Sequence, residues 1–114
     1  MKVSEIVEAL KLETVCGLDN LEKEVTGGYT GDLLSDVMGN AREGYLWVTR
    51  QVHQNIVAVA SLKELAGIIL INSSRPARET IEKAEAEKIP ILVSDLPAFE
   101  LSGRVYNLLT AKNL

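Results

Sequence analysis

The run Gly67-Ile68-Ile69-Leu70-Ile71 is apolar at every position. A strand with one face in water alternates apolar and polar residues, whereas a continuous apolar run is typical of a parallel strand covered by helices on both faces. Downstream, a helix is predicted to begin at Pro76 and a second buried strand to cover Ile89–Val93. A final helix, capped by Asp95, is predicted to extend to about Thr110. This alternation of strands and helices predicts an α/β domain with a largely parallel sheet.

Upstream of this run, the segment Tyr45–Thr49 is rich in residues that favour strands. The segment that follows it has two interpretations. Asn55–Ala60 has the β-branched content of a strand, yet it leads directly into residues of helical character. Only about a dozen residues separate Thr49 from Gly67, roughly the minimum for a helical crossover between parallel strands. We therefore predict a buried helix over His53–Leu65.

The N-terminal part of the chain contains four further predicted elements. A helix over Glu5–Leu10 is followed by short strands over Glu13–Cys16 and Glu22–Thr26. After a glycine-rich stretch, Thr30 is expected to cap a helix over Asp32–Met38. Together, all these elements predict a three-layer α/β/α arrangement around a sheet of about five strands.

The composition is that of an ordinary globular protein of 114 residues, with 46% hydrophobic and 25% charged side chains. We expect a single domain over residues 1–114, without a cofactor. The net charge of −4 and the lack of a basic stripe argue against nucleic acid as a partner. No apolar run approaches the roughly 20 residues that cross a bilayer, so we expect no membrane partner and a cytoplasmic location. The single cysteine, Cys16, excludes an intrachain disulfide.

The stretch Thr26-Gly27-Gly28-Tyr29-Thr30-Gly31-Asp32 holds three of the chain's eight glycines. Glycine tolerates positive φ and lets the backbone approach a neighbour closely, so a glycine cluster between a strand and a helix is either a tight turn or a ligand cradle. We expect Gly28 to adopt a positive φ, and we therefore expect its replacement by valine to destabilise the domain.

In open α/β sheets, ligands bind beyond the carboxyl ends of the strands. Polar residues follow several of the predicted strands, and in a parallel sheet we expect them to converge on one edge. The candidate ligand-binding residues are Thr26, Gly27, Gly28, Thr49, His53, Ser73 and Arg75. The other interpretation is that turns between strands and helices need polar capping residues in any case. Capping explains Arg75 and His53 least well.

No established catalytic template fits the sequence. A phosphate-binding loop needs the pattern G-x-x-x-x-G-K-[ST], but Gly31 is followed by Asp32, which repels phosphate. The single histidine, His53, and the single cysteine, Cys16, could form a catalytic pair only if folding brought them together. Histidines, cysteines and clustered carboxylates are too few for a metal site. We therefore expect no enzyme activity, no catalytic residues and no bound metal.

Three blocks of the sequence resemble the DRTGG domain family. They are Val25–Met38, His53–Ala60 and Ile89–Leu92, in an order and spacing that cover nearly the whole chain. Glu24 and Val25 stand where the family name has Asp and Arg. Domains of this family are similar to the N-terminal domain of bacterial HPr kinase/phosphorylase. They also occur joined to CBS domains in regulated pyrophosphatases and joined to phosphotransacetylases. The resemblance implies an accessory role in regulation or oligomer contacts, and free-standing copies resemble small proteins encoded near iron-only hydrogenase and redox-complex genes.

Two functions from different classes are compatible with these features. The first is a non-catalytic regulatory or assembly module that forms a homodimer or docks on a larger partner, including a redox or hydrogenase complex. Tyr29, Tyr45 and Trp47 lie near the glycine stretch and predict a dimer interface there, because Tyr and Trp are enriched in interface cores. The second is a small-molecule sensor that binds a nucleotide or another anionic metabolite at the strand-end edge. An enzyme would need His53 within hydrogen-bonding reach of Cys16 or of a serine in a cleft.

Overall fold

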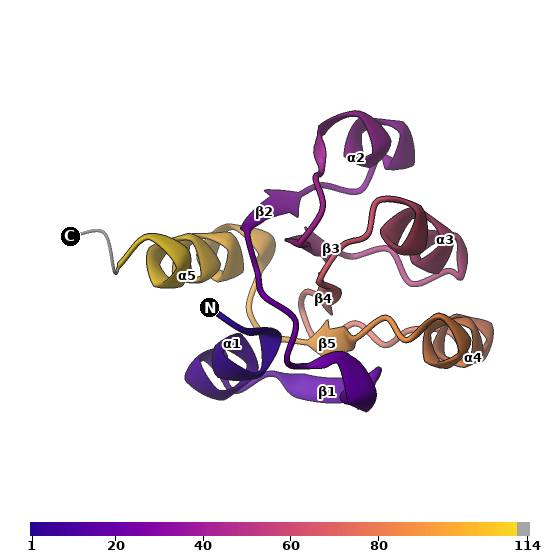
Figure 1. Ribbon diagram of the computed structural model, residues 1–114, viewed down its shortest axis with the longest axis horizontal. Coiled ribbons are helices and arrows are strands. Elements are labelled where there is room, and N and C mark those ends of the chain that lie inside the picture. Colours follow the sequence, from indigo (N-terminus) through magenta and orange to yellow (C-terminus); the bar gives the residue numbers. More distant parts are fainter. Residues whose placement is uncertain (112–114) are drawn as a thin grey trace.

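The protein folds around a five-stranded sheet, as seen in a computed structural model that describes residues 1–111 (Figure 1). The strands are β1 (Glu13–Cys16), β2 (Gly27–Thr30), β3 (Tyr45–Thr49), β4 (Gly67–Leu70) and β5 (Ile91–Val93). Their order across the sheet is β1-β5-β4-β3-β2. All neighbouring pairs are parallel except β1 and β5, which are antiparallel. The prediction of a largely parallel sheet of about five strands is therefore confirmed.

Helices cover both sides of this sheet (Figure 1). They are α1 (Val3–Leu10), α2 (Leu34–Asn40), α3 (Asn55–Leu62), α4 (Arg78–Glu87) and α5 (Ala98–Thr110). The crossovers from β2 to β5 all step in the same direction along the sheet. Crossovers of one hand then place α2, α3 and α4 on a single face. The chain returns along the other face through α5, which packs beside α1 (Figure 1).

Two apolar cores lie on the opposite faces of the sheet. Trp47, Ile68 and Ile91 belong to the core under α2, α3 and α4. Leu46 and Ile69 belong to the core under α1 and α5. Because neighbouring residues of a strand point to opposite faces, a central strand must be apolar at every position. The continuous apolar run predicted to be a doubly covered strand is therefore confirmed as β4, whose residues are all buried.

Several predicted elements agree closely with the structure. The predicted strands Glu13–Cys16 and Tyr45–Thr49 have the observed bounds, and the segment with two interpretations is a helix, Asn55–Leu62. Among residues 1–111, no helix combines the length and the apolar character that crossing a membrane requires.

Three predictions around the turns are wrong. The strand expected over Glu22–Thr26 is displaced, because β2 begins only at Gly27 and contains the glycines themselves. Glycine has a low strand propensity, which made this segment resemble a loop. Thr30 is the last residue of β2 and does not cap α2, which begins at Leu34. Asp95 does not cap α5 either, since the cap position is Pro97.

Candidate functional site

Asp32 organises the carboxyl ends of β2 and β3. Its carboxylate accepts a hydrogen bond from the Thr49 hydroxyl, with Oγ1 and Oδ1 2.8 Å apart, and another from the backbone N–H of Arg50 at 3.0 Å. The Arg50 guanidinium lies 3.4 Å from the other carboxylate oxygen. The side-chain amide of Gln51 donates to the Asp32 carbonyl oxygen at 2.9 Å. The candidate residue Thr49 thus lies at the predicted edge, but its hydroxyl proton is already used within the chain.

The turn after β4 is strained and tightly bonded. Asn72 and Ser73 have φ angles of 53° and 58°, so two consecutive residues other than glycine adopt the left-handed conformation. The Ser73 hydroxyl donates to Asp95, with Oγ and Oδ1 2.6 Å apart, and the Ser73 N–H donates to the carbonyl oxygen of Ser94 at 2.8 Å. The candidate residue Ser73 therefore lies at the predicted edge and links the carboxyl ends of β4 and β5.

Arg75 and His53, the candidate residues that capping explains least well, differ in the contacts that their side chains make. The Arg75 guanidinium donates two hydrogen bonds to the Glu13 carboxylate, at 2.6 and 2.9 Å. These hydrogen bonds hold the pKa of Glu13 below its usual range and raise the pKa of Arg75. The positive charge expected to attract an anion is therefore balanced within the chain. The carbonyl oxygen of His53 accepts a hydrogen bond from the N–H of Ile56 at 3.2 Å. Its exposed side chain makes no hydrogen bond or ion pair with the residues that the structure describes.

Three of the candidate ligand-binding residues lie away from the carboxyl edge of the sheet. Thr26 and Gly27 lie at the amino end of β2, where the Thr26 hydroxyl donates to the carbonyl oxygen of Glu43 at 2.7 Å. Gly28 lies within β2 and pairs with Leu46 of β3. The expected convergence of these three residues with Thr49 and Ser73 is wrong, because β2 begins later in the chain than predicted. Gly31 and Asp32 directly follow the carboxyl end of β2, where Thr26, Gly27 and Gly28 were expected.

The expected backbone conformation of Gly28 is also wrong. The glycines with positive φ in residues 1–111 are Gly17 and Gly44. A Cβ added to Gly28 would meet only the carbonyl oxygen of Leu46, at an ordinary contact distance of 3.4 Å. The fold of the single chain therefore places no strict demand for glycine at this position.

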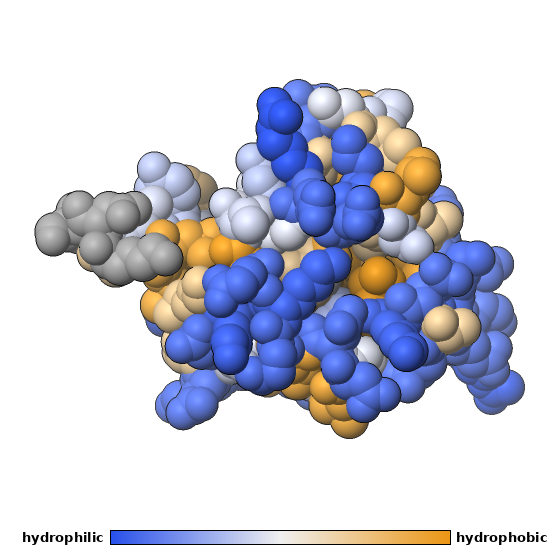
Figure 2. Space-filling view, viewed as in Figure 1, coloured by the Kyte–Doolittle hydropathy of each residue, from blue (hydrophilic) through white to orange (hydrophobic). Residues whose placement is uncertain are grey.

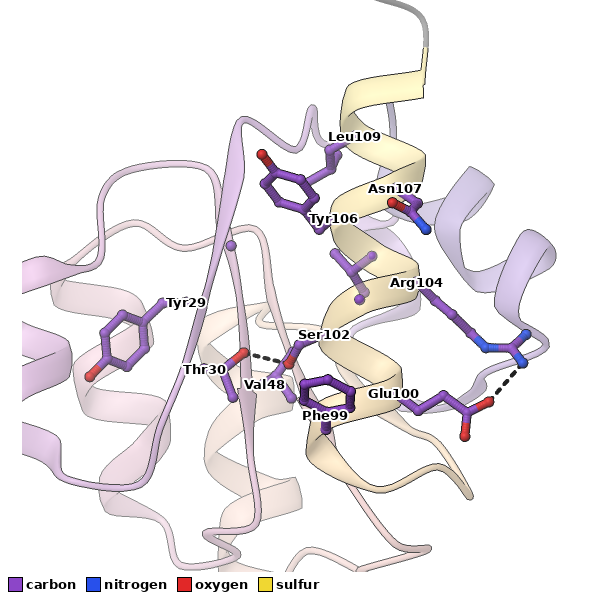
Figure 3. Close-up of a pocket in the computed structure, with 13 residues that line it drawn as sticks. Tyr29, Thr30, Val48, Phe99, Glu100, Ser102, Arg104, Tyr106, Asn107 and Leu109 are labelled. Atoms are coloured by element: carbon purple, nitrogen blue, oxygen red, sulfur yellow. Dashed lines mark hydrogen bonds and ion pairs between the residues drawn. The ribbon is translucent and has the colours of Figure 1, made fainter. Parts of the chain in front are cut away.

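A groove with a cavity volume of about 720 Å³ lies between β2 and α5 (Figure 3). Gly28 and Thr30 of β2 and Val48 of β3 contribute to one wall, and residues of α5 form the other. Phe99 is 93% exposed and Tyr106 is 67% exposed. Figure 2 shows hydrophobic side chains gathered over α5, on the side of the molecule away from α3 and α4.

The groove was not predicted from the sequence, although α5 carries a signal for it. Phe99, Ser102, Tyr106 and Leu109 have the 3-4-3 spacing of one helix face, in addition to the predicted core face. Figure 3 shows Phe99, Ser102 and Tyr106 on the side of α5 toward β2. A helix with two partly apolar faces packs its core face inward and leaves the second one for another contact.

A second cavity, of about 620 Å³, lies at the amino ends of β2 and β3. Thr26 and Tyr45 line it together with the charged residues Lys23, Glu24, Arg42 and Glu43. The lining mixes both signs of charge, so it favours neither an anion nor a cation.

Two of the aromatic residues expected at a dimer interface make hydrogen bonds within the chain. Trp47 is fully buried, and its indole N–H donates to the carbonyl oxygen of Gly31 at 2.8 Å. Its predicted place at an interface is therefore wrong, because β3 lies inside the sheet. The Tyr29 hydroxyl donates to the Asp36 carboxylate of α2, and this bond raises the pKa of Tyr29 to about 12. Tyr29 contributes to the lining of the groove, but its ring points away from α5 (Figure 3).

The pair that an enzyme would require is not formed in the described chain. Cys16 is buried on β1, and burial raises the pKa of its thiol to about 11. Its sulfur lies 4.0 Å from the carbonyl oxygen of Ile89. His53 is bonded neither to Cys16 nor to a serine among residues 1–111. No group of three potential metal ligands comes together in this part of the chain either.

Comparison with known proteins finds a likeness in structure only. The sequence matches no model of a protein family and no curated protein. Among solved structures, the chain is similar to the CBS and DRTGG domains of the regulatory region of Clostridium perfringens pyrophosphatase, complexed with the activator diadenosine tetraphosphate. The TM-score is 0.72 at 15% identity, over 90% of this chain and 44% of that one. The likeness does not bear on similarity to HPr kinase. It shows that this chain has a DRTGG/CBS-like α/β fold.

Proposed function

We propose that this chain is a non-catalytic regulatory or assembly module, which acts by binding a second copy of itself or a larger protein partner. The observation that carries the proposal is the groove between β2 and α5, where Phe99 and Tyr106 expose most of their surface. Large apolar side chains gathered beside a groove are typical of protein interaction sites. The structural similarity to a regulatory region supports the same class of function.

The contrast between the groove and the strand-end edge supports this choice. At the edge, the groups of Thr49, Ser73 and Arg75 are bonded to carboxylates of the same chain. A ligand there must compete with these bonds. The groove instead presents apolar surface and the outer edge of β2, which pairs with no other strand of the described chain. Binding of a protein partner there removes both from water.

The proposal is tested by light scattering over a wide range of protein concentration, combined with affinity capture of partners from the native host. We expect either a concentration-dependent dimer or a partner that is captured by the native chain and lost with Phe99→Asp. Leu62→Asp is the matched control, because Leu62 is an exposed apolar residue at the end of α3, on the other face of the sheet. A monomer at high concentration whose captured proteins are unaffected by Phe99→Asp would contradict the proposal.

A second candidate function is a sensor of a nucleotide or another anionic metabolite at the strand-end edge. The consecutive left-handed residues Asn72 and Ser73 favour it, because backbone strain is concentrated at functional sites. The similar pyrophosphatase regulatory region was solved with a dinucleotide activator. His53 and Arg75 would provide contacts to the anion. A ligand at a hundred times its Kd stabilises a protein by about 2.7 kcal/mol, so a thermal-shift screen of nucleotides and acyl phosphates is decisive. Melting curves that do not move, or a shift that persists in Arg75→Gln, would count against this site.

A further inference from the structure

β2 is an edge strand without the usual protection against pairing. Its sequence, Gly27-Gly28-Tyr29-Thr30, contains no proline and no charged residue, and β3 is its only partner strand in the described chain. Proteins normally protect exposed edges with charges, prolines or bulges, because an open edge is a template for another strand. Among residues 1–111, a Cβ added to Gly28 would meet only the carbonyl oxygen of Leu46, at 3.4 Å. The absent side chain of Gly28 leaves room in the groove for a second backbone.

The outer face of α5 has matching features. Phe99, Ser102, Tyr106 and Leu109 form a stripe at the 3-4-3 spacing of a helix–helix contact. Next to this stripe, a Cβ added to Gly103 would have no atom of residues 1–111 within 4 Å. Glycine inside a helix is less favourable than alanine. No contact within the described part of the chain compensates for this at Gly103, whereas a closely packed second helix would.

The edge strand and this helix face lie side by side. Thr30 and Ser102, which are 72 positions apart in sequence, have their hydroxyl oxygens 2.7 Å apart. Gly28 and Thr30 pair with Leu46 and Val48, which belong to the core under α5, so they share its side of the sheet. Any partner that occupies the groove therefore contacts the strand edge and the stripe together.

Building on the proposed regulatory and assembly function, we propose that the groove is occupied by a second copy of this chain. A two-fold axis perpendicular to the sheet, passing near Thr30 and Ser102, lays β2 antiparallel to β2 of the second copy. The same axis lays α5 antiparallel to the second α5. One closed, self-complementary contact thus satisfies both features, which is the usual property of a two-fold dimer.

The spacing on α5 fits this axis. In an antiparallel helix pair centred between Ser102 and Gly103, Phe99 of each copy lies opposite Tyr106 of the other. The two aromatic pairs then flank the axis, and aromatic pairs add stability beyond the area that they bury. Gly103 lies near the centre, where the two helix backbones approach most closely.

Area and charge favour the same occupant. A fully exposed aromatic side chain buries about 150–250 Å² on packing. Phe99 is 93% exposed and Tyr106 is 67% exposed, so the two from each copy supply about 500–800 Å². Leu109 and the strand edge of each copy bring the interface toward the roughly 1,200 Å² at which stable specific interfaces begin. Glu100 and Arg104 also line the groove, and they form an ion pair of 2.8 Å with each other (Figure 3). The contact therefore buries no unpaired charge.

The helix register is tested by a cysteine cross-link. Gly103→Cys is expected to form an intermolecular disulfide under mild oxidation by dissolved oxygen, because the two cysteines face each other near the axis. Gly39→Cys in α2 is the matched control, since a Cβ there also has no atom of the described residues within 4 Å. The native Cys16 is buried, and burial raises the pKa of its thiol to about 11, so it does not compete.

The interface is tested separately by light scattering. We expect Phe99→Asp to raise the dimer Kd by about 30-fold or more, as at an interface hot spot, and Leu62→Asp to leave it unchanged. A dimer that survives Phe99→Asp refutes this interface but leaves self-association intact. A dimer that Phe99→Asp dissociates, without a cross-link in Gly103→Cys, refutes the antiparallel helix register. A native chain that stays monomeric at high concentration refutes both this proposal and the self-associating form of the proposed function, and leaves only docking on a larger partner.

Discussion

Gly17→Ala is the substitution that the structure expects to damage the fold most directly. Gly17 follows β1 with a φ of +78°. A Cβ there would lie 2.4 Å from Cα and 2.5 Å from N of Pro90, and 2.6 Å from the carbonyl carbon of Ile89. These are backbone atoms at the entry to β5, so they cannot rotate away as a side chain could. The substitution therefore forces β1 and β5 apart at the antiparallel edge of the sheet.

Two terms set the size of the effect. A left-handed conformation costs a residue with a Cβ about 1–2 kcal/mol. Forcing an extra carbon into a well-packed site costs about 1–3 kcal/mol. Their sum, about 2–5 kcal/mol, is a large part of the 5–15 kcal/mol that stabilises a typical domain. For a domain near 100 residues, each kcal/mol lowers Tm by about 4–8 °C, so Tm should fall by about 10 °C or more.

Urea denaturation followed by far-ultraviolet circular dichroism measures this loss. The matched control is Gly39→Ala, which has open space for its Cβ and should gain up to about 1 kcal/mol from helix propensity. We expect the two variants to move in opposite directions from the native chain. If Gly17→Ala unfolds within about 0.5 kcal/mol of the native chain, the clash with Pro90 does not constrain the fold and the reasoning fails.

Three further predictions concern single side chains. Trp47→Phe should lower the free energy of unfolding by about 1–3 kcal/mol in urea, because it removes the 2.8 Å bond to the carbonyl oxygen of Gly31; an unchanged midpoint would show that this bond adds nothing. The pKa of Tyr29 is raised from 10.0 to about 12 by its bond to Asp36. Its contribution to stability should thus be complete below pH 10 and be lost as the pH rises from about 10 to 12, and Tyr29→Phe should abolish this part of the pH dependence in urea titrations. Cys16 should resist a thiol reagent at neutral pH until denaturant is added, because burial raises the pKa of its thiol to about 11; immediate labelling of the native protein would show that β1 opens readily.

The success of the fold prediction depended on how local each signal was. The run at Gly67–Leu70 is apolar on both faces, and only a strand covered on both sides keeps all of it from water. The helix at Asn55–Leu62 followed from the short distance between two strands, although its β-branched residues favoured the opposite assignment. In both cases the decisive information lay within about 20 residues of sequence, which is the range of one strand and its crossover.

For the candidate site, the positions of residues could be predicted from the sequence, but their long-range contacts could not. Thr49, the last residue of β3, and Ser73, shortly after β4, lie at the carboxyl edge as predicted. Their positions could be predicted because the end of a strand depends on neighbouring residues in the sequence. The pairing that uses up their polar groups was not predicted, since Arg75 meets Glu13 across 62 positions and Ser73 meets Asp95 across 22. The groove was missed for the same reason, as its two walls lie 72 positions apart at Thr30 and Ser102.

The glycines illustrate the division between local and long-range information. Local sequence determines the α/β class, the central strands and most of the helices, because periodicity and propensity act over neighbouring residues. Whether a glycine is required depends on which atoms face it. Gly17 is constrained by Pro90, Gly27 lies against the ring of Tyr45, and Gly28 and Gly103 border an open groove. The atoms that face each glycine come from segments that are distant in sequence and that folding brings together. The local sequence pattern around a glycine therefore does not predict them.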